Sequence, residues 1–282
     1  MKKWIVLCGC VVLFTPMLQA QTAWLPPAGE LDISPSYTFQ SFDEFWAGRD
    51  TKVKLPDSVN QHTAWVGFDY GITDRWAADA SLGYTWVAST EAFGGNAKDD
   101  GLADTSLGLR YLLAKEEDYE CPFMPSIAIR GGVIIEGTYD ENTPFSAGDG
   151  ASGLEGSFLF TKTICPGFGL FGDIGYRARN HHVPDDLFGF AGLYVQYRAL
   201  TASFGYRHVQ SLSGQDIGPD PFTFPELKEI NQNLELSMGF SDQGGRLYQI
   251  FYAHTIDGRN TGEKDIVGAS ISIPLDVGAA GR

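Results

Sequence analysis

Acidic and basic residues recur on one face of segments in which apolar and polar side chains alternate. In residues 101–113, GLADTSLGLRYLL, apolar side chains fall on one face of an extended chain, and Asp104 and Arg110 fall on the other. Because a charge removed from water needs a partner, we expect such residues to pair across neighbouring strands, either bracing a closed interior or lining a charged conduit. The full set of charges assigned to this polar face is Asp69, Asp79, Asp104, Arg110, Arg130, Glu136, Glu155, Asp173, Arg177, Arg207 and Glu235.

A histidine close to a serine is the pair that a hydrolase would use as base and nucleophile. His208 and Ser211 are the candidates, but a spacing of three places them on opposite faces of a strand. His254 has Asp257 nearby but no serine at a suitable spacing. We therefore predict that the chain is not an enzyme and has no catalytic residues, with an outer-membrane-embedded lipid hydrolase as the alternative.

Two loop regions contain residue types that bind metal ions. His181 and His182 precede two aspartates at 185–186, and acidic residues cluster at 98–104 and 148–150. Paired loop histidines are usually solvated, and neither acidic cluster has the complete spacing of an EF-hand loop. We predict no metal site and no cofactor.

Alternation of apolar and polar residues continues along nearly the whole chain, and the helical period is nearly absent. The pattern predicts about twelve strands, most of them longer than the roughly 5–6 residues of a soluble strand and long enough to cross a membrane, which takes about 9–11. The expected strands lie near residues 29–42, 60–70, 76–88, 102–114, 124–139, 152–164, 168–179, 187–197, 200–211, 229–240, 246–256 and 264–275.

The predicted connections differ in length between the two ends of the strands. Short turns such as 71–75, 165–167 and 198–200 follow the even strands, and long polar loops follow the odd ones. We therefore predict an all-β fold, a transmembrane up-and-down antiparallel β-barrel, with a soluble periplasmic β-sandwich as the rival. Aromatic residues gather at strand ends, as they do at membrane interfaces: Tyr70, Trp76, Trp86, Tyr111, Tyr139, Tyr176, Tyr197 and Tyr206.

Two cysteines flank a predicted strand pair. Cys121 precedes the fifth predicted strand and Cys165 follows the sixth. If these strands pair antiparallel, both cysteines lie at the short-turn end, within reach of each other. We predict a disulfide between them, with two free thiols as the alternative.

The chain begins with the pattern of a secretory signal peptide. Lys2 and Lys3 precede an apolar run, Trp4–Phe14, that is too short to span a bilayer, and Leu18–Ala20 fits a cleavage site. We predict a signal peptide over residues 1–20, export to the cell outer membrane of a Gram-negative cell, and one barrel domain over 21–282. The net charge of −15 excludes nucleic acid as a partner, because the phosphate backbone would be repelled.

Five motifs resemble a family of outer-membrane proteins labelled "MetA-pathway of phenol degradation". They are GLADTSLGLRYLL (101–113), DEFWAG (43–48) with a downstream LP, TPFSAGDGAS (143–152), GDIGYRAR (172–179) with a following PDD, and GRNTG (258–262). The resemblance implies a barrel of roughly twelve strands that passes small aromatic or otherwise hydrophobic compounds, and it implies no catalytic residues. The chain ends SISIPLDVGAAGR, without the usual final aromatic residue, so the last strand either closes near Ile273 or is misplaced.

Together these features predict an outer-membrane channel or transporter for small molecules without covalent chemistry. The alternatives are a lipid hydrolase and a purely structural barrel. The expected partners are outer-membrane lipid, lipopolysaccharide and a small solute of unknown identity. Acidic side chains in the outer loops are expected to repel anions and to bind divalent cations that bridge lipopolysaccharide: Asp99, Asp100, Asp149, Asp185, Asp186, Asp216 and Asp220.

Overall fold

A computed structural model describes residues 22–89, 97–121, 123–141, 146, 148, 150–217 and 224–278; the predicted signal peptide lies outside them. Two short 3-10 turns, η1 (Glu116–Asp118) and η2 (Phe224–Glu226), are the helical elements of the described chain, and neither could cross a membrane. The strands are β1 (Glu30–Ala47), β2 (Thr51–Thr73), β3 (Trp76–Ser89), β4 (Ala97–Leu102), β5 (Thr105–Ala114), β6 (Ser126–Ile135), β7 (Gly153–Cys165), β8 (Phe168–Arg179), β9 (Asp186–Tyr197), β10 (Leu200–Ser211), β11 (Ile230–Ser241), β12 (Leu247–Arg259) and β13 (Asp265–Asp276).

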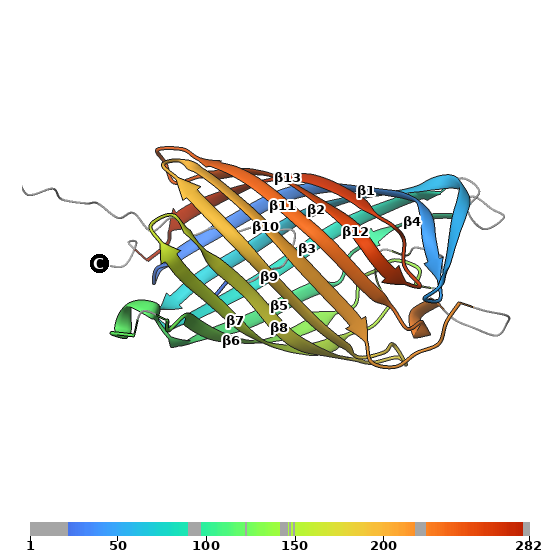
Figure 1. Ribbon diagram of the computed structural model, residues 1–282, viewed down its shortest axis with the longest axis horizontal. Helices are drawn as coiled ribbons and strands as arrows, with labels where there is room; N and C mark the ends of the chain where they lie inside the picture. Colours follow the sequence, from blue (N-terminus) through green and yellow to red (C-terminus); the bar gives the residue numbers. More distant parts are fainter. Residues whose placement is uncertain are drawn as a thin grey trace, which may run out of the picture.

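The strands form one antiparallel sheet that closes on itself. β13 returns to pair with β1, from Glu30 opposite Asp276 to Ser41 opposite Asp265, and Figure 1 shows the tilted strands wrapping into a barrel. β4 and β5 both pair with β3 and occupy one position in the barrel, so the thirteen strands make a twelve-stranded barrel. The predicted fold class is therefore confirmed, and the last strand does close over Ile273.

Side chains alternate between an apolar outer face and a largely polar inner face. Leu154, Phe158 and Ile250 are about 60% exposed on the outside, at 63%, 60% and 64% respectively. Strands 187–197 and 246–256 are apolar on both faces, so the sequence pattern does not say which face of each strand turns toward the lumen. In the structure Phe190 and Phe251 point inward and are buried. A continuous belt of exposed apolar side chains is the surface that a lipid-embedded barrel presents.

The segment before β1, residues 22–28, enters the barrel from the short-turn end. The amide of Ala23 donates to Thr161 Oγ1 at 3.1 Å, and Arg110 Nη1 donates to the carbonyl oxygen of Trp24 at 3.2 Å. The turn at Pro26–Pro27 passes so close to Gly71 that a Cβ there would collide with two backbone oxygens. We call residues 22–28 the N-terminal segment. It narrows the lumen at this end.

The predicted disulfide is wrong: Cys121 and Cys165 are exposed free thiols. The pairing of β6 with β7 ends at Ser126 opposite Thr161, and the chain before β6 turns away from the edge of β7. Glu116 takes up that edge instead, accepting from the amide of Thr163 at 3.0 Å. Cys165 ends β7 opposite Phe168 of β8, whereas Cys121 lies on the unpaired connection before β6.

Tyr139 also departs from the expected place at a strand end on the outer face. β6 ends at Ile135, and the chain turns inward after it, with the amide of Thr138 donating to the carbonyl oxygen of Leu102. Tyr139 is buried, and its hydroxyl donates to Asp104. This aromatic ring holds the chain against the inner face at the break between β4 and β5.

Candidate functional site

Buried ion pairs cross the inner face from strand to strand. Arg110 on β5 pairs with Asp69 on β2, and its Nε lies 3.6 Å from Asp79 Oδ1 on β3. Arg130 on β6 pairs with the same Asp79, at 2.6 Å, and with Glu155 on β7. Arg110 is only 1% exposed, so its charge depends on these carboxylates.

The ion pairs continue from β7 to β9 through a third arginine. Arg177 on β8 lies 3.4 Å from Glu155 and 3.9 Å from Asp186 on β9. Asp186 also accepts a hydrogen bond of 2.9 Å from Ser211 Oγ. We call this continuous set the charge network: Asp69, Asp79, Arg110, Arg130, Glu155, Arg177 and Asp186.

Two glycines make room for the central arginine. Gly108 and Gly132 flank Arg130 on the neighbouring strand and on its own strand. A Cβ at Gly108 would lie 2.5 Å from Arg130 Nη2, and one at Gly132 would lie 2.8 Å from Nη1. The small residues between the charges are thus needed for the guanidinium to lie flat across the inner face.

The remaining predicted charges form separate pairs. Arg207 on β10 and Glu235 on β11 are 2.6 Å apart, and Asp104 lies 3.3 Å from an arginine that the sequence analysis did not select, Arg179. Glu136, after the end of β6, is 35% exposed and lies 3.5 Å from His181.

Asp173 is buried on the inner face of β8, as expected of the predicted set. Sequence reasoning also missed Asp32, which is buried on β1. Asp32 shares one face of the strand with Ser34 and Thr38, and this spacing could have identified it as an inner-face residue.

A second wall of the inner face carries hydroxyl and amide groups instead of a continuous chain of ion pairs. Ser34 on β1 and Ser272 on β13 lie 3.1 Å apart, and Ser203 on β10 and Ser237 on β11 lie 2.7 Å apart. The inner face therefore differs between its two sides, with the charge network on β2–β9 and hydroxyls and amides on β10–β13 and β1.

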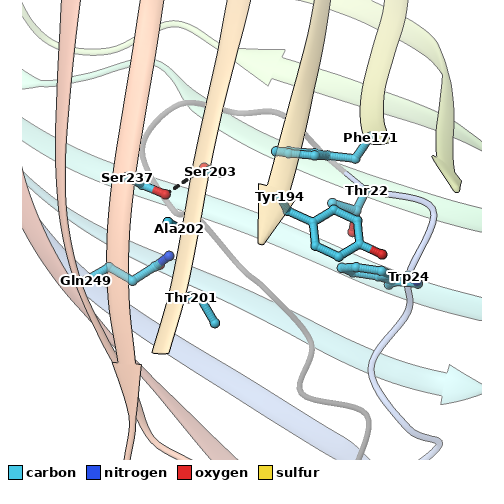
Figure 2. A pocket seen from close by; sticks show the side chains of 9 residues that line it. All are labelled: Thr22, Trp24, Phe171, Tyr194, Thr201, Ala202, Ser203, Ser237 and Gln249. Atoms are coloured by element: carbon cyan, nitrogen blue, oxygen red, sulfur yellow. Dashed lines mark hydrogen bonds between the residues drawn. The ribbon is translucent and has the colours of Figure 1, made fainter. Parts of the chain in front are cut away.

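Two cavities open inside the barrel. The larger, near the long-connection end, has a volume of about 430 Å³ and is lined by Gln40, Phe42, Arg177, Asn231 and Asn233 among others. The smaller has a volume of about 10 Å³, about enough for one water molecule. Figure 2 shows it between Trp24 of the N-terminal segment and the inner wall, with Tyr194 beside the indole. The rings of Trp24 and Tyr194 meet edge to face at 5.2 Å.

The outer end is held by charged contacts between connecting segments. Both oxygens of Asp216 accept from Arg259 at 2.6 Å, and this hydrogen bonding lowers the pKa of the Asp216 carboxyl. Asp185 accepts from the hydroxyl of Tyr176 and from a backbone amide, which lowers its pKa as well. These carboxylates are thus engaged in holding the rim together.

The geometry gives no hydrolase pair at the predicted candidates. Ser211 points inward and donates to Asp186, whereas His208 is on the opposite face with its Nδ1 3.5 Å from the hydroxyl of Tyr206. His254 contacts Asp265 at 3.0 Å, on the outer side. Within the described residues no group of three or more histidine, cysteine or acidic side chains is arranged to hold a metal ion.

Solved outer-membrane barrels have the same fold. A COG4313 outer membrane channel from Pseudomonas putida F1 superposes with a TM-score of 0.69 at 11% identity, over 93% of this chain and 100% of that one. The translocator domain of the autotransporter NalP from Neisseria meningitidis gives 0.54 at 13% identity, over 88% of each chain. A KdgM porin in complex with disordered oligogalacturonate gives 0.50 at 6% identity, over 86% and 98%. At such identities the likeness shows the fold.

The sequence itself matches one family model. No curated protein sequence matches the chain. The model labelled "MetA-pathway of phenol degradation" matches residues 50–208, more than half of the 282 residues. The matched region runs from β2 to β10 and includes the whole charge network. The chain therefore belongs to the MetA-pathway of phenol degradation family.

Proposed function

We propose that this protein is an outer-membrane channel that passes small molecules, aromatic or otherwise hydrophobic, without covalent chemistry. The observation that carries the proposal is the cavity of about 430 Å³ inside a barrel whose outside is apolar. A purely structural barrel of this size would gain stability by filling that space with side chains. The four carboxylates of the charge network are paired with its three guanidiniums along the wall, so most of its charge is compensated within the wall.

The N-terminal segment acts in this proposal as a movable constriction. Beside Trp24 the gap has a volume of about 10 Å³, so a solute larger than water passes only when this segment shifts. The segment has two hydrogen bonds to the barrel, one to Thr161 and one from Arg110, and its other contacts are packing of Ala23 and Leu25 in one apolar cluster and of Trp24 against Tyr194. Local openings of weakly held segments are common in folded proteins.

The surroundings of the constriction favour aromatic solutes. Trp24, Phe171 and Tyr194 present ring faces to the gap, and Phe171 and Phe190 are 5.2 Å apart. Aromatic rings gain about 0.5–1.5 kcal/mol from such pairing beyond the burial of their area. The family label points to the same class of compound.

The setting proposed for the channel is the outer membrane, reached through a cleaved signal peptide, with lipid and lipopolysaccharide around the exposed apolar belt. Of the acidic side chains expected to bind divalent cations between lipopolysaccharide molecules, the exposed Asp100 is retained in this proposal. Asp186 is buried, Asp185 and Asp216 hold the rim, and Asp149 and Asp220 lie outside the described residues. The N-terminal residue of the protein recovered from outer membranes, read by mass spectrometry, tests both the location and the cleavage.

The function is tested by recording single-channel currents of the purified full chain in planar bilayers. We expect discrete openings in potassium chloride, and uptake of small neutral solutes by liposomes that contain the protein. A chain that inserts but shows neither openings nor solute uptake would mean that the barrel is structural only.

A further inference from the structure

Three adjacent strands carry polar residues that face the lumen in register. On β10, β11 and β12, Thr201 lies opposite Gly239, which in turn lies opposite Gln249. Six residues further along β11, Asn233 lies between Arg207 and Thr255. We call these lumen-facing polar residues the β10–β12 track: Thr201, Ser203, Asn231, Asn233, Ser237, Gln249 and Thr255.

The two ends of the track have buried polar atoms without partners among the described residues. Gln249 Oε1 and Thr201 Oγ1 mark the inner end, and these residues are 5% and 6% exposed. Asn233 Oδ1 and Thr255 Oγ1 mark the outer end, and these residues are 8% and 0% exposed. More than about 90% of buried polar groups in native proteins are paired, and leaving one unpaired costs ~1–3 kcal/mol. Thr201, Gln249 and Asn233 line the two cavities, where water or a ligand completes these hydrogen bonds.

Both cavities open onto this track. The large cavity is lined by Asn231 and Asn233, and the small gap by Thr201, Ser203, Ser237 and Gln249. Figure 2 shows the amide of Gln249 and the side chain of Thr201 directed toward the space beside the N-terminal segment.

The N-terminal segment is attached mainly to strands away from this wall. It contacts Arg110 on β5, Ala128 on β6, Leu159 and Thr161 on β7, and Tyr194 on β9. Thr22 and Trp24 face the inner end of the track across the small gap. Gly239 adds depth at the inner end, since a Cβ there would lie 2.7 Å from Thr201 Oγ1 and 2.9 Å from Gln249 Cγ.

The groups along the track define the chemistry of its ligand. The oxygens that lack a partner on Thr201, Asn233 and Gln249 can accept hydrogen bonds, so a ligand that carries donors satisfies them. Glu235 compensates the charge of Arg207 through Nε at 2.6 Å, which leaves no net counter-charge for an ionised solute, and Nη2 of Arg207 adds one donor to the wall. The rings of Trp24, Phe171 and Tyr194 face the inner end and fit a flat apolar body.

We propose that the β10–β12 track is the solute-binding path of the channel, with an outer position at Asn233 and an inner position at Gln249, and that it takes neutral aromatic molecules carrying hydroxyl groups. The proposal rests on the function proposed above and adds the wall, the two positions and the ligand class. A hydroxylated ring hydrogen-bonds at the outer position first. It then reaches the inner position when the N-terminal segment shifts.

The test records potassium current through the purified full chain in planar bilayers with hydroquinone as the probe. 1,4-Dimethoxybenzene is the matched control, because it has the same ring and oxygens but no donor. We expect hydroquinone to interrupt the current at about tenfold lower concentration than the ether, the ratio that corresponds to ~1.4 kcal/mol. Equal block by the two compounds would overturn the proposed ligand class.

Two variants locate the binding positions. Gln249→Met and Asn233→Leu keep side-chain size but remove the amide, and each is expected to weaken hydroquinone block about tenfold. Ser81→Ala is the matched control, because it removes a buried, unpaired hydroxyl from β3 on the opposite wall. If Ser81→Ala weakens the block as much as Gln249→Met does, the track is not the path.

A binding measurement that does not depend on current distinguishes failure of the track from failure of the channel function. Calorimetric titration of hydroquinone into the detergent-solubilised chain measures binding whether or not the barrel conducts. Binding that Gln249→Met weakens, in a chain that shows no openings, would retain the track and overturn the channel function. Current without any hydroquinone binding would retain the channel function and overturn the track. Circular dichroism of each variant checks that the barrel has formed.

Discussion

The hydrogen bond from the amide of Ala23 to Thr161 Oγ1 is a direct way to loosen the N-terminal segment without changing the barrel. Thr161→Val replaces the hydroxyl by a methyl group at a position that is 0% exposed, on the inner face of β7. The amide of Ala23, on a residue that is 1% exposed, then has no acceptor at 3.1 Å. When the segment leaves the wall, the same amide bonds to water.

The size of the effect follows from the burial of that amide. An unsatisfied buried donor costs ~1–3 kcal/mol, which shifts an equilibrium between docked and released segment by about 5–150-fold. The released state is the conducting one in the function proposed above. We therefore expect single-channel openings of Thr161→Val to be at least about fivefold more frequent, with unit conductance unchanged.

Thr63→Val is the matched control. Thr63 is also buried, and its hydroxyl lies 2.9 Å from that of Thr85 in the pairing of β2 with β3, where within the described residues it makes no hydrogen bond to the segment. It is expected to leave the opening frequency as it is. Hydrogen exchange of the amides of residues 22–25 gives a second readout, which should accelerate by the same factor as the openings. Unchanged exchange and unchanged opening in Thr161→Val would refute the constriction.

Three further outcomes are expected. Arg130→Met leaves Asp79 and Glu155 without their central partner, so thermal unfolding should show a loss of ~3–5 kcal/mol, and a loss below 1 kcal/mol would contradict the network. Asp216→Asn should lower the free energy of local opening of residues 212–217 at neutral pH by less than about 1 kcal/mol, because Asp216 is exposed in its pair with Arg259. Faster hydrogen exchange of these residues measures the change. Since the pKa of Asp216 is lowered on folding, its contribution is present above the ordinary value of 3.8 and is lost as pH falls through the lowered pKa; a difference that persists at lower pH would contradict this. The two exposed cysteine thiols should each accept maleimide in the folded protein, and resistance until a reductant is added would restore the disulfide.

The strand positions could be predicted because one face of each strand meets a different environment from the other. Period-two alternation persists through β7 and β11, and the expected ranges fall within a few residues of these strands. The expected range 60–70 misses the first nine residues of β2, because β1 and β2 continue as a paired hairpin where a long loop was expected. The charged residues of the network stood out for the same reason. They interrupt the inner-face sequence of small residues at positions such as 110 and 130.

Features that depend on contacts between distant segments could not be predicted. Residues 22–28 show no periodicity, and their place inside the barrel depends on Arg110 and Thr161, which lie far along the chain. The break between β4 and β5 at Ala103 likewise depends on a residue of another segment, because the hydroxyl of the buried Tyr139 donates to Asp104. Alternation assigns a face to each residue but does not say where a strand is interrupted.

The pairing of β1 with β13 has a consequence for how the protein assembles. This ladder joins the two ends of the described chain, so it is the pairing with the greatest sequence separation, and we expect it to form after the intervening hairpins. Until then both strands have unpaired backbone groups along one edge, which is the surface that promotes edge-to-edge aggregation. An exported chain of this design must be protected along those two edges, and closure of the barrel is the step that ends its exposure to misassembly.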